Sequence, residues 1–506
     1  MSNLTASICI GSLAVAVVGV FTLHWRIFRY GLDLADEGYL WYGALEVLKG
    51  KVPIRDFRAY DPGRYYWCAF WMRLLGSRNR SVRVAMLVIQ VGGVWLATLL
   101  VHATRHSWLA TILWAFAISA CMRPWYRTIE PTFAIAGVAI ALMLVSDPTP
   151  TRAIAIGFFV ALSVLAGLNL AIYNGGGALI AICLAPASSA ASVSAIVGAY
   201  LTGVALGLGV LLLLFARIRG FLRAYWQRKI FAVLRRGTTN LPLPVPWLWR
   251  KTPRGRFIKT CFTALPLFYV GSLVWLMFSG VSSSSADEVF AAAVCVGIFY
   301  MHHALSRADA AHLFVAIPPF LIAVAPLLFG SWLGWAVGLA IAAAIFRCVH
   351  SRHDLFLAYR RTPAALCRYR VDGHLLWVPK TLAAVLDTMR QVVDSHTAPG
   401  EPALFVPVLV TLYPLFARRP AAYDVFCVYP ANRAAQEEMI ASITQQGVRL
   451  ALVWNGALDG QDDRRFSNTH ALVWNHLHAR FQPVPLMTSD GDLRCFVKKC
   501  DQHNGI

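Results

Sequence analysis

Long apolar stretches separated by short polar ones dominate the first 350 residues of this chain. About 20 consecutive apolar residues are enough to cross the hydrocarbon core of a bilayer as a helix. The pattern therefore predicts a polytopic α-helical membrane protein with about eleven transmembrane helices. The predicted spans lie near 6–25, 82–103, 107–122, 130–146, 153–167, 171–186, 194–216, 260–280, 287–304, 311–328 and 330–348.

The loops between these spans differ sharply in polarity. With eleven spans, the long charged segments 26–81, 217–259 and 349–506 all fall on one side of the membrane. The opposite loops, such as 104–106 and 280–286, are short and nearly uncharged. This asymmetry predicts a reaction site on one face. Because that face is the basic one, the positive-inside rule alone would place it in the cytoplasm.

The pattern changes at about residue 350. Helical periodicity then alternates with short apolar runs, which is typical of a small α/β domain with a partly parallel sheet. We therefore divide the chain into a transmembrane domain, 1–349, and a soluble domain, 350–506. The latter contains neither a GxGxxG motif nor a P-loop, so no nucleotide is expected. Its predicted helices are 380–395, 432–446 and 471–480, and its predicted strands are 403–410, 449–454 and 493–498.

Composition agrees with this assignment. Only 14% of the 506 residues are charged, against about 25% in soluble proteins. The net charge of +21 would suggest nucleic acid in a soluble protein. Here the basic residues flank apolar runs, which favours anionic or phosphate-bearing lipids as partners. The 11 cysteines show no metal-ligand spacing, so we expect no metal site and no cofactor, although a weak divalent-cation site among carboxylates stays open.

The stretch 34–50 is the most informative polar segment. It places Asp36 and Glu37 at the head of an amphipathic helix directly after the first span. Carboxylates beside lipid are costly unless they are used, so the pair is a candidate catalytic site. The alternative is that Asp36 caps the helix and Glu37 favours its positive end. We predict two interfacial helices within about 36–76.

Three further residues of this loop suit a phosphate leaving group. Arg58, Asp61 and Arg64 place guanidinium groups beside carboxylates. A carboxylate can deprotonate an acceptor hydroxyl, while a guanidinium fork clamps phosphate. These residues are therefore candidates for substrate and phosphate binding.

Two later segments add candidates on the same face. The loop 300–312 carries Arg307, Asp309 and His312, which suit a lipid phosphate or, alternatively, a pair that only fixes the loop. Tyr173 lies in the glycine-rich stretch 167–179, where glycines allow a substrate to approach the backbone or simply allow helices to pack. The basic stretch 217–237 indicates a membrane-surface helix, and its simpler interpretation is a head-group anchor.

Together these residues resemble the C-type glycosyltransferase superfamily, whose polytopic enzymes use polyprenyl-phosphate sugars. The resemblance rests on Asp36, Glu37 and Tyr39 after the first span, and on the stretches 50–53 and 61–67. It is greatest to bacterial protein mannosyltransferase-like and aminoarabinose-transferase-like enzymes. The resemblance implies that Asp36 is the general base with Glu37 beside it, and that the site is extracytoplasmic.

The resemblance also implies that basic residues of the loops hold the donor phosphate, here Arg58, Arg64 and Arg307. The chain departs from aminoarabinose transferases at a Lys-Pro-Pro-like position, where it has Asp61-Pro62-Gly63. The phosphate-binding role of that position is then expected to pass to Arg64.

We therefore predict an inverting glycosyltransferase in the bacterial inner membrane, with its site and C-terminal domain on the periplasmic side. Its partners would be a polyprenyl-phosphate sugar donor, membrane lipid, and a saccharide, lipid or protein acceptor, but no nucleic acid. Two alternatives remain open. One is a non-enzymatic transporter of lipid-linked saccharides or an envelope-assembly protein, and the other is a polysaccharide polymerase.

Overall fold

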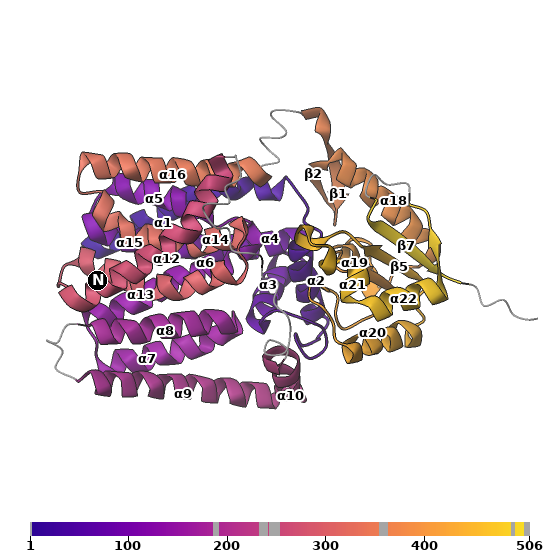
Figure 1. Cartoon of the computed structure of the whole chain (residues 1–506), viewed down its shortest axis with the longest axis horizontal. Helices are drawn as coiled ribbons and strands as arrows, with labels where there is room; N and C mark the ends of the chain where they lie inside the picture. The colour runs from indigo at the N-terminus through magenta and orange to yellow at the C-terminus, as the bar shows by residue number, and fades with distance from the viewer. Residues whose placement is uncertain are drawn as a thin grey trace, which may run out of the picture. The chain divides into compact units, whose positions relative to one another are not determined.

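The computed structural model describes residues 3–185, 192–231, 241, 253–353, 363–486 and 491–499. The chain forms two compact units, coloured by residue number in Figure 1. Each unit is assembled from segments that are distant in sequence. Unit 1 comprises Met1–Ile27, Arg83–Ile218 and Asn240–Asp354, and unit 2 comprises Phe28–Val82, Arg219–Thr239 and Leu355–Ile506. The sequence pattern does not predict that the first long loop joins the C-terminal region, and the predicted boundary near residue 350 stays a prediction.

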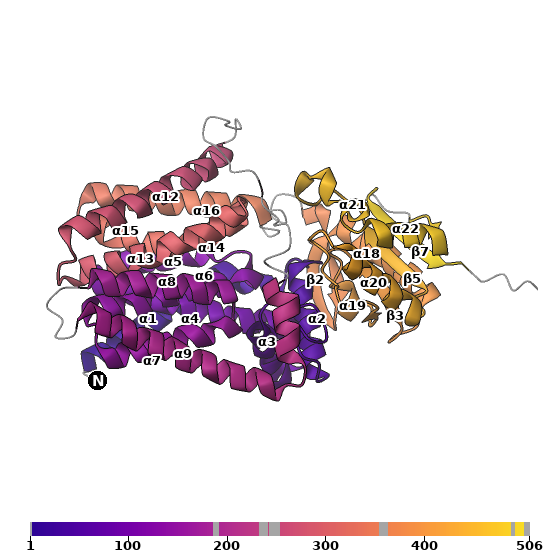
Figure 2. The ribbon, with the colours of Figure 1, turned by 60° about the horizontal axis from the view of Figure 1, so that its bottom comes forward.

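Unit 1 consists of helices, and each of the eleven predicted spans falls on a helix or on a bent pair of helices (Figures 1 and 2). Among the described residues, seven helices are long and apolar enough to cross a membrane. The pair α14 and α15, bent by 52°, is an eighth candidate, while α5, α7 and α8 are shorter apolar helices. The helices are α1 (Asn3–His24), α4 (Asn79–Arg105, which starts in unit 2), α5 (Trp108–Cys121), α6 (Ile129–Ser146), α7 (Pro150–Leu162), α8 (Leu168–Leu184), α9 (Val193–Arg217), α12 (Pro253–Ser279), α13 (Ser285–Ser306), α14 (Ala310–Ala316), α15 (Pro318–Leu328) and α16 (Trp332–His353).

Small residues set the closest helix crossings of unit 1. A side chain at Gly203 of α9 would place its Cβ 2.0 Å from the backbone oxygen of Ile154 in α7. Gly157 of α7 meets the backbone of Tyr200 in the same way, at 2.2 Å. In a bilayer, where no hydrophobic effect drives helices together, such backbone approach supplies the packing energy. This explains why α7 and α9 lie side by side along their lengths (Figure 1).

Unit 2 begins with two helices of the first loop, α2 (Asp36–Leu48) and α3 (Pro62–Leu75). Both faces of α2 are buried, including the charged Glu37 and Glu46, because α2 packs on α3 and on α19 (Leu412–Leu415). In contrast, α3 exposes an apolar face that includes Phe70 and Leu74. An exposed apolar face suits an interfacial helix. The interfacial placement of both helices stays a prediction.

The C-terminal region contains the predicted mixed sheet. Five strands lie in the order β4-β3-β5-β7-β6, with β3 parallel to β4 and β5, and with β7 antiparallel to β5 and β6. An antiparallel hairpin of β1 and β2 forms a second sheet. The strands are β1 (Leu366–Val371), β2 (His374–Pro379), β3 (Pro402–Val406), β4 (Arg419–Pro420), β5 (Leu450–Trp454), β6 (Phe481–Val484) and β7 (Leu493–Lys498), and the helices, besides α19, are α18 (Lys380–His396), α20 (Arg433–Gln445), α21 (Phe466–Thr469) and α22 (Ala471–Arg480).

Two details differ from the predicted elements of this region. The strand predicted to run to Val410 ends at Val406, because the chain turns there and enters α19. The β1–β2 hairpin was not predicted, although its turn carries an Asp-Gly pair. Asp372 and Gly373 have φ values of 47° and 81°, and Asp-Gly adopts this left-handed geometry at little cost.

Candidate functional site

The turn before α2 is held by a reciprocal cap. Asp33 Oδ1 accepts hydrogen bonds from the backbone N–H groups of Ala35 and Glu37, at 3.0 and 3.1 Å. In return, Glu37 Oε2 accepts from the backbone N–H of Asp33 at 3.1 Å. Such exchange satisfies N–H groups that a helix start otherwise leaves open. Capping is thus carried by Asp33 and Glu37, whereas the sequence alternative assigned it to Asp36.

Asp36 is oriented by an aromatic neighbour instead. Its carboxylate accepts a hydrogen bond from the Tyr60 hydroxyl at 3.2 Å. The backbone N–H of Tyr60 in turn donates to the Tyr65 hydroxyl at 3.0 Å. The Tyr60 ring also meets the edge of the Tyr39 ring, with centroids 4.9 Å apart. These contacts fix the position of one carboxylate oxygen of Asp36.

Three carboxylates crowd this turn, which we call the acidic turn: Asp33, Asp36 and Glu37. Burial and, after it, the charges of Asp36 and Glu37 raise the pKa of Asp33 from its ordinary 3.8 to about 6. Like charges close together disfavour ionisation. Among the described residues, no group of three or more His, Cys, Asp or Glu side chains is arranged to hold a metal ion.

A residue of the C-terminal region clamps the acidic turn. The Thr411 hydroxyl donates to the backbone oxygen of Asp33 at 2.7 Å, and its N–H donates to the backbone oxygen of Leu34 at 3.0 Å. A Cβ at Gly38 would lie 2.1 Å from Thr411 Oγ1 and 2.4 Å from its backbone nitrogen. Gly38 therefore permits an approach that no other residue allows. Sequence reasoning missed this contact, although the glycine directly after the carboxylate pair was a signal.

Arg58 is engaged by the C-terminal region. Its guanidinium forms an ion pair with Asp424, and its backbone N–H donates to the backbone oxygen of Tyr423 at 3.0 Å. Burial opposes the charge of Arg58, but the carboxylate of Asp424 outweighs it and raises the pKa of the guanidinium. Phosphate binding by Arg58 stays a prediction, and this partner favours a structural role.

Arg64 lies closer to the acidic turn. Its guanidinium sits over the Tyr60 ring, 5.6 Å from the centroid, and the hydroxyl of that ring donates to Asp36. One tyrosine thus links the candidate base to a candidate phosphate ligand. The ring quadrupole attracts a cation placed over its face, and phosphate binding by Arg64 stays a prediction.

Asp61 is buried next to a cation that sequence reasoning did not single out. Its Oδ2 lies 3.0 Å from Lys229 Nζ, and the residue is 4% exposed. Lys229 belongs to the short π-helical turn η4 (Trp226–Ile230), which follows α10 (Phe221–Tyr225). The basic stretch 217–237 was the signal for it. Residues 232–237 of that stretch lie outside the described residues.

In unit 1 the second predicted cluster is assembled around Asp309. Arg307 Nε and His312 Nδ1 lie 2.8 and 2.9 Å from its two carboxylate oxygens. Asp309 also caps α14 by accepting the backbone N–H of His312 at 2.8 Å. Burial opposes ionisation of Asp309, but the bonds from His312 and Arg307 prevail and hold its pKa well below the usual range. This geometry matches the alternative in which the pair fixes the loop, and a binding role stays a prediction.

Tyr173 lies on the same end of unit 1 in helix α8. Its hydroxyl is 2.8 Å from His302 Nδ1, and its ring meets that of Tyr300 at 5.1 Å. The glycines after it serve packing: a Cβ at Gly176 would lie 2.4 Å from the Phe299 ring, and one at Gly177 would lie 2.9 Å from Val296.

The predicted site residues therefore form two groups, each within one unit. Those of unit 2 are Asp36, Glu37, Arg58, Asp61 and Arg64, and those of unit 1 are Tyr173, Arg307, Asp309 and His312.

Comparison with known proteins bears on the fold. No protein-family model matches the chain, and no curated protein sequence matches it. Among solved structures, ArnT from Cupriavidus metallidurans in the apo state is similar over 98% of both chains, with a TM-score of 0.53 and 11% identity. The same protein bound to undecaprenyl phosphate gives a TM-score of 0.52 and 12% identity over 99% of both chains.

A second similar structure is the oligosaccharyltransferase AglB from Archaeoglobus fulgidus in complex with an inhibitory peptide and a dolichol-phosphate. It shares 12% identity over 89% of this chain and 69% of its own, with a TM-score of 0.44. The extent of the ArnT similarity, over nearly the whole of both chains, decides the architecture. The chain therefore shares the fold of ArnT, a multi-pass helical domain with a small α/β domain at its C-terminus.

Proposed function

We propose that this protein is an integral-membrane glycosyltransferase that moves a sugar from a polyprenyl-phosphate donor to a saccharide, lipid or protein acceptor. The observation that carries the proposal is the division of labour in the acidic turn. Asp33 and Glu37 exchange the capping hydrogen bonds, while Asp36 accepts a hydrogen bond from Tyr60, the ring over which Arg64 lies. Support for a lipid-phosphate donor comes from the ArnT structure of the same fold, which holds undecaprenyl phosphate.

In the proposed reaction, Asp36 takes the proton of the acceptor hydroxyl. The resulting oxygen nucleophile attacks the anomeric carbon of the donor sugar, and the bond from that carbon to the phosphate oxygen breaks. Polyprenyl phosphate leaves with the electron pair, and configuration at the anomeric carbon inverts. Arg64 is the proposed phosphate ligand, because a guanidinium group binds phosphate in a bidentate manner.

The localisation follows from the same proposal. A polyprenyl-phosphate sugar presented outside the cytoplasm requires an extracytoplasmic site. We therefore place the acidic turn and the C-terminal region on the periplasmic side of a bacterial inner membrane, against the positive-inside count.

The test is sugar transfer from a radiolabelled pool of polyprenyl-phosphate sugars in membranes, comparing the wild type with Asp36→Asn at matched expression. The amide keeps the shape but cannot accept the proton, so transfer is expected to fall by about 10²–10⁴-fold. The matched control is Asp147→Asn, an exposed carboxylate paired with Arg152. Transfer by Asp36→Asn within threefold of the control would remove Asp36 from catalysis. A wild type inactive towards every donor supplied would sink the enzyme proposal itself.

A further inference from the structure

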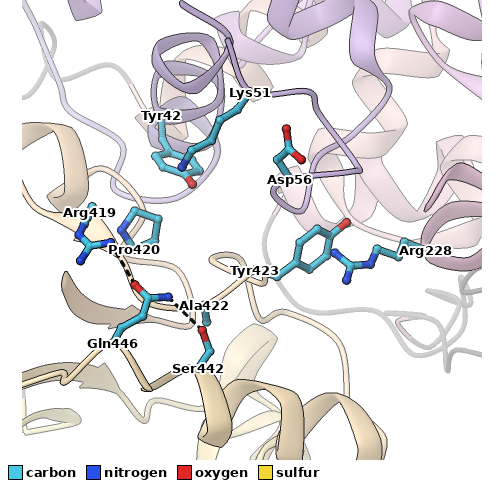
Figure 3. Close-up of a pocket in the computed structure, with 10 residues that line it drawn as sticks. All are labelled: Tyr42, Lys51, Asp56, Arg228, Arg419, Pro420, Ala422, Tyr423, Ser442 and Gln446. Atoms are coloured by element: carbon cyan, nitrogen blue, oxygen red, sulfur yellow. Dashed lines mark hydrogen bonds between the residues drawn. The ribbon is translucent and has the colours of Figure 1, made fainter. Parts of the chain in front are cut away.

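Unit 2 contains a cavity whose lining includes none of the three carboxylates of the acidic turn (Figure 3). It is lined by side chains of the first loop, of the segment 219–231, and of strand β4 and helix α20. Its volume is about 340 Å³, near the lower end of the roughly 300–1,000 Å³ typical of ligand sites. The size therefore suits a single sugar unit. We call this cavity the basic pocket after its cations, Lys51, Arg228 and Arg419.

Most charges at the pocket are paired, but not all. Glu46 is shared by Lys49 and Lys51, so one of these two cations is not balanced. Arg55 pairs with Asp56, and Arg228 pairs with Glu438 at 3.2 Å. Of the charged residues that line the pocket, Lys51, Arg228 and Arg419 are cations and Asp56 is a carboxylate. The lining thus carries a surplus of positive charge, which attracts an anion.

Arg419 is the cation that points most directly to a ligand. Its guanidinium reaches only the neutral amide oxygen of Gln446, at 3.4 Å, and has no acidic partner among the described residues. Guanidinium groups in clefts are usually matched by carboxylate or phosphate. In Figure 3 Arg419 and Gln446 flank the cavity opposite Asp56 and Arg228.

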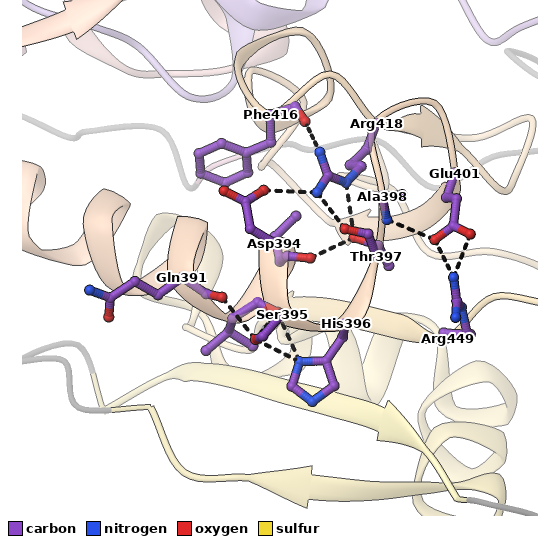
Figure 4. A network of polar contacts seen from close by, with 12 residues as sticks. Gln391, Asp394, Ser395, His396, Thr397, Ala398, Glu401, Phe416, Arg418 and Arg449 are labelled. Carbon is purple, nitrogen blue, oxygen red and sulfur yellow. Dashed lines mark hydrogen bonds and ion pairs between the residues drawn. The ribbon is translucent and has the colours of Figure 1, made fainter.

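The residue before Arg419 is held in a network of polar contacts, which Figure 4 shows around Arg418. Arg418 is buried, and its guanidinium donates to Thr397 Oγ1 at 2.9 Å and to Asp394 Oδ1 at 2.8 Å. The backbone N–H of Arg419 donates to the backbone oxygen of Glu401 at 3.1 Å. These contacts hold the backbone of Arg419 at strand β4, while its side chain is exposed.

The remaining lining suits sugar hydroxyls. Asp56 offers carboxylate oxygens, and Ser442 and Gln446 offer side-chain oxygens. Tyr423 contributes an aromatic ring on which Arg228 stacks at 3.8 Å. Hydrogen-bonding groups beside an aromatic ring are typical of sites that orient small polar ligands.

We propose that the basic pocket binds an acidic sugar of the acceptor, one that carries a carboxylate or a phosphate. The proposal rests on the proposed function. Tyr42 of the pocket lies on α2, the helix that begins with Asp36. Six residues separate them, or about 9 Å along a helix axis. An acceptor chain anchored at the pocket therefore needs to extend only a short way to bring a hydroxyl to Asp36.

The test is equilibrium binding to the full chain in an uncharged detergent, at fixed ionic strength, measured by calorimetry. The probes are glucuronate, glucose 1-phosphate, glucose and inorganic phosphate. At least one of the two acidic sugars is expected to bind tenfold more tightly than glucose or phosphate alone. Arg419→Gln is expected to weaken that binding at least tenfold. The control, Arg433→Gln, removes an exposed ion-paired arginine of α20 outside the pocket and is expected to change nothing.

Each contrary result overturns a defined part. Equal binding of inorganic phosphate and the acidic sugars contradicts a saccharide site, and unchanged binding by Arg419→Gln contradicts the pocket. Asp36→Asn should bind the probes as the wild type does. Probe binding without any loss of transfer in Asp36→Asn would refute the proposed reaction and leave the pocket standing. Loss of transfer in Asp36→Asn without probe binding by the wild type would refute the pocket and leave the reaction standing. In transfer assays, Arg419→Gln should raise the KM for acceptor and leave kcat within twofold.

Discussion

Asp33 and Asp309 perform the same local task in two different settings. Each lies before a helix and accepts backbone N–H groups of its first turn. The pKa of Asp33 is raised to about 6, because burial and two neighbouring carboxylates disfavour its charge. The pKa of Asp309 is held well below its usual range, since the bonds from His312 and Arg307 outweigh burial.

The difference shows what neighbours do to one residue type. Around Asp309 the charges are matched, which is how a loop is fixed. In the acidic turn three carboxylates stand together, and the turn tolerates them because the Thr411 clamp and the cap hold the backbone. Unfavourable charge retained at a rigid position is typical of a functional site. The comparison therefore favours unit 2 as the location of proton chemistry.

Removing the rigidity should produce the largest effect. In Gly38→Ala the new methyl would meet the backbone of Thr411 at 2.4–2.7 Å, so the turn must shift. We expect a loss of about 3 kcal/mol of stability and a loss of about 100-fold in kcat for transfer, because catalytic groups tolerate little displacement. Thermal unfolding in detergent and steady-state transfer measure the two effects.

The control for this variant is Gly209→Ala in helix α9, where a Cβ meets nothing within 4 Å. We expect it to be neutral or to stabilise by about 0.5–1 kcal/mol, as alanine does inside a helix. If Gly38→Ala keeps full kcat, Thr411 does not position Asp36. A fall in stability without a fall in kcat would assign the clamp to folding alone.

Asp309→Asn should have a smaller effect. The amide oxygen still caps α14, but the charge that pairs with Arg307 and His312 is lost. We expect about 2 kcal/mol of destabilisation at pH 7. Because the folded pKa of Asp309 is lowered, its contribution is present above the unfolded pKa and is lost as pH falls through the folded value. Unfolding measured from pH 7 to pH 3 should show a constant stability difference between the two proteins down to about pH 4 and a shrinking difference below it.

Asp33→Asn should have an effect of the opposite sign. Asn also caps, and it removes the charge that its neighbours disfavour. Because the folded pKa is raised from 3.8 to about 6, the wild type loses stability as pH rises between these values. We expect the variant to be more stable by up to about 3 kcal/mol above pH 6, which is the stability the wild type loses through this pKa shift, with no difference near pH 4. The same melting series checks this expectation. A stability difference in favour of the variant that is smaller at pH 8 than at pH 4 would contradict the assignment.

The candidate residues show how far the sequence reached. It singled out Asp36 and Glu37 as candidates, because carboxylates after an apolar span are conspicuous, and it grouped Arg307, Asp309 and His312 because they are neighbours in the chain; their functional roles stay predictions. It missed Asp33, Tyr60, Lys229 and Thr411, which contribute through contacts rather than through composition. The capping alternative was assigned to Asp36 because residue type alone does not show which of two nearby aspartates reaches the N–H groups.

Apolar periodicity and length are local properties of the chain, and they were enough to predict the apolar helices and the mixed sheet. All eleven predicted spans lie on helices for this reason. That residues 28–82 and 219–231 belong to one unit with the C-terminal region became visible only in the folded structure. Contacts such as Thr411 with Asp33, or Arg58 with Asp424, join residues more than 300 positions apart. Their formation depends on packing complementarity, which no local pattern in the sequence records.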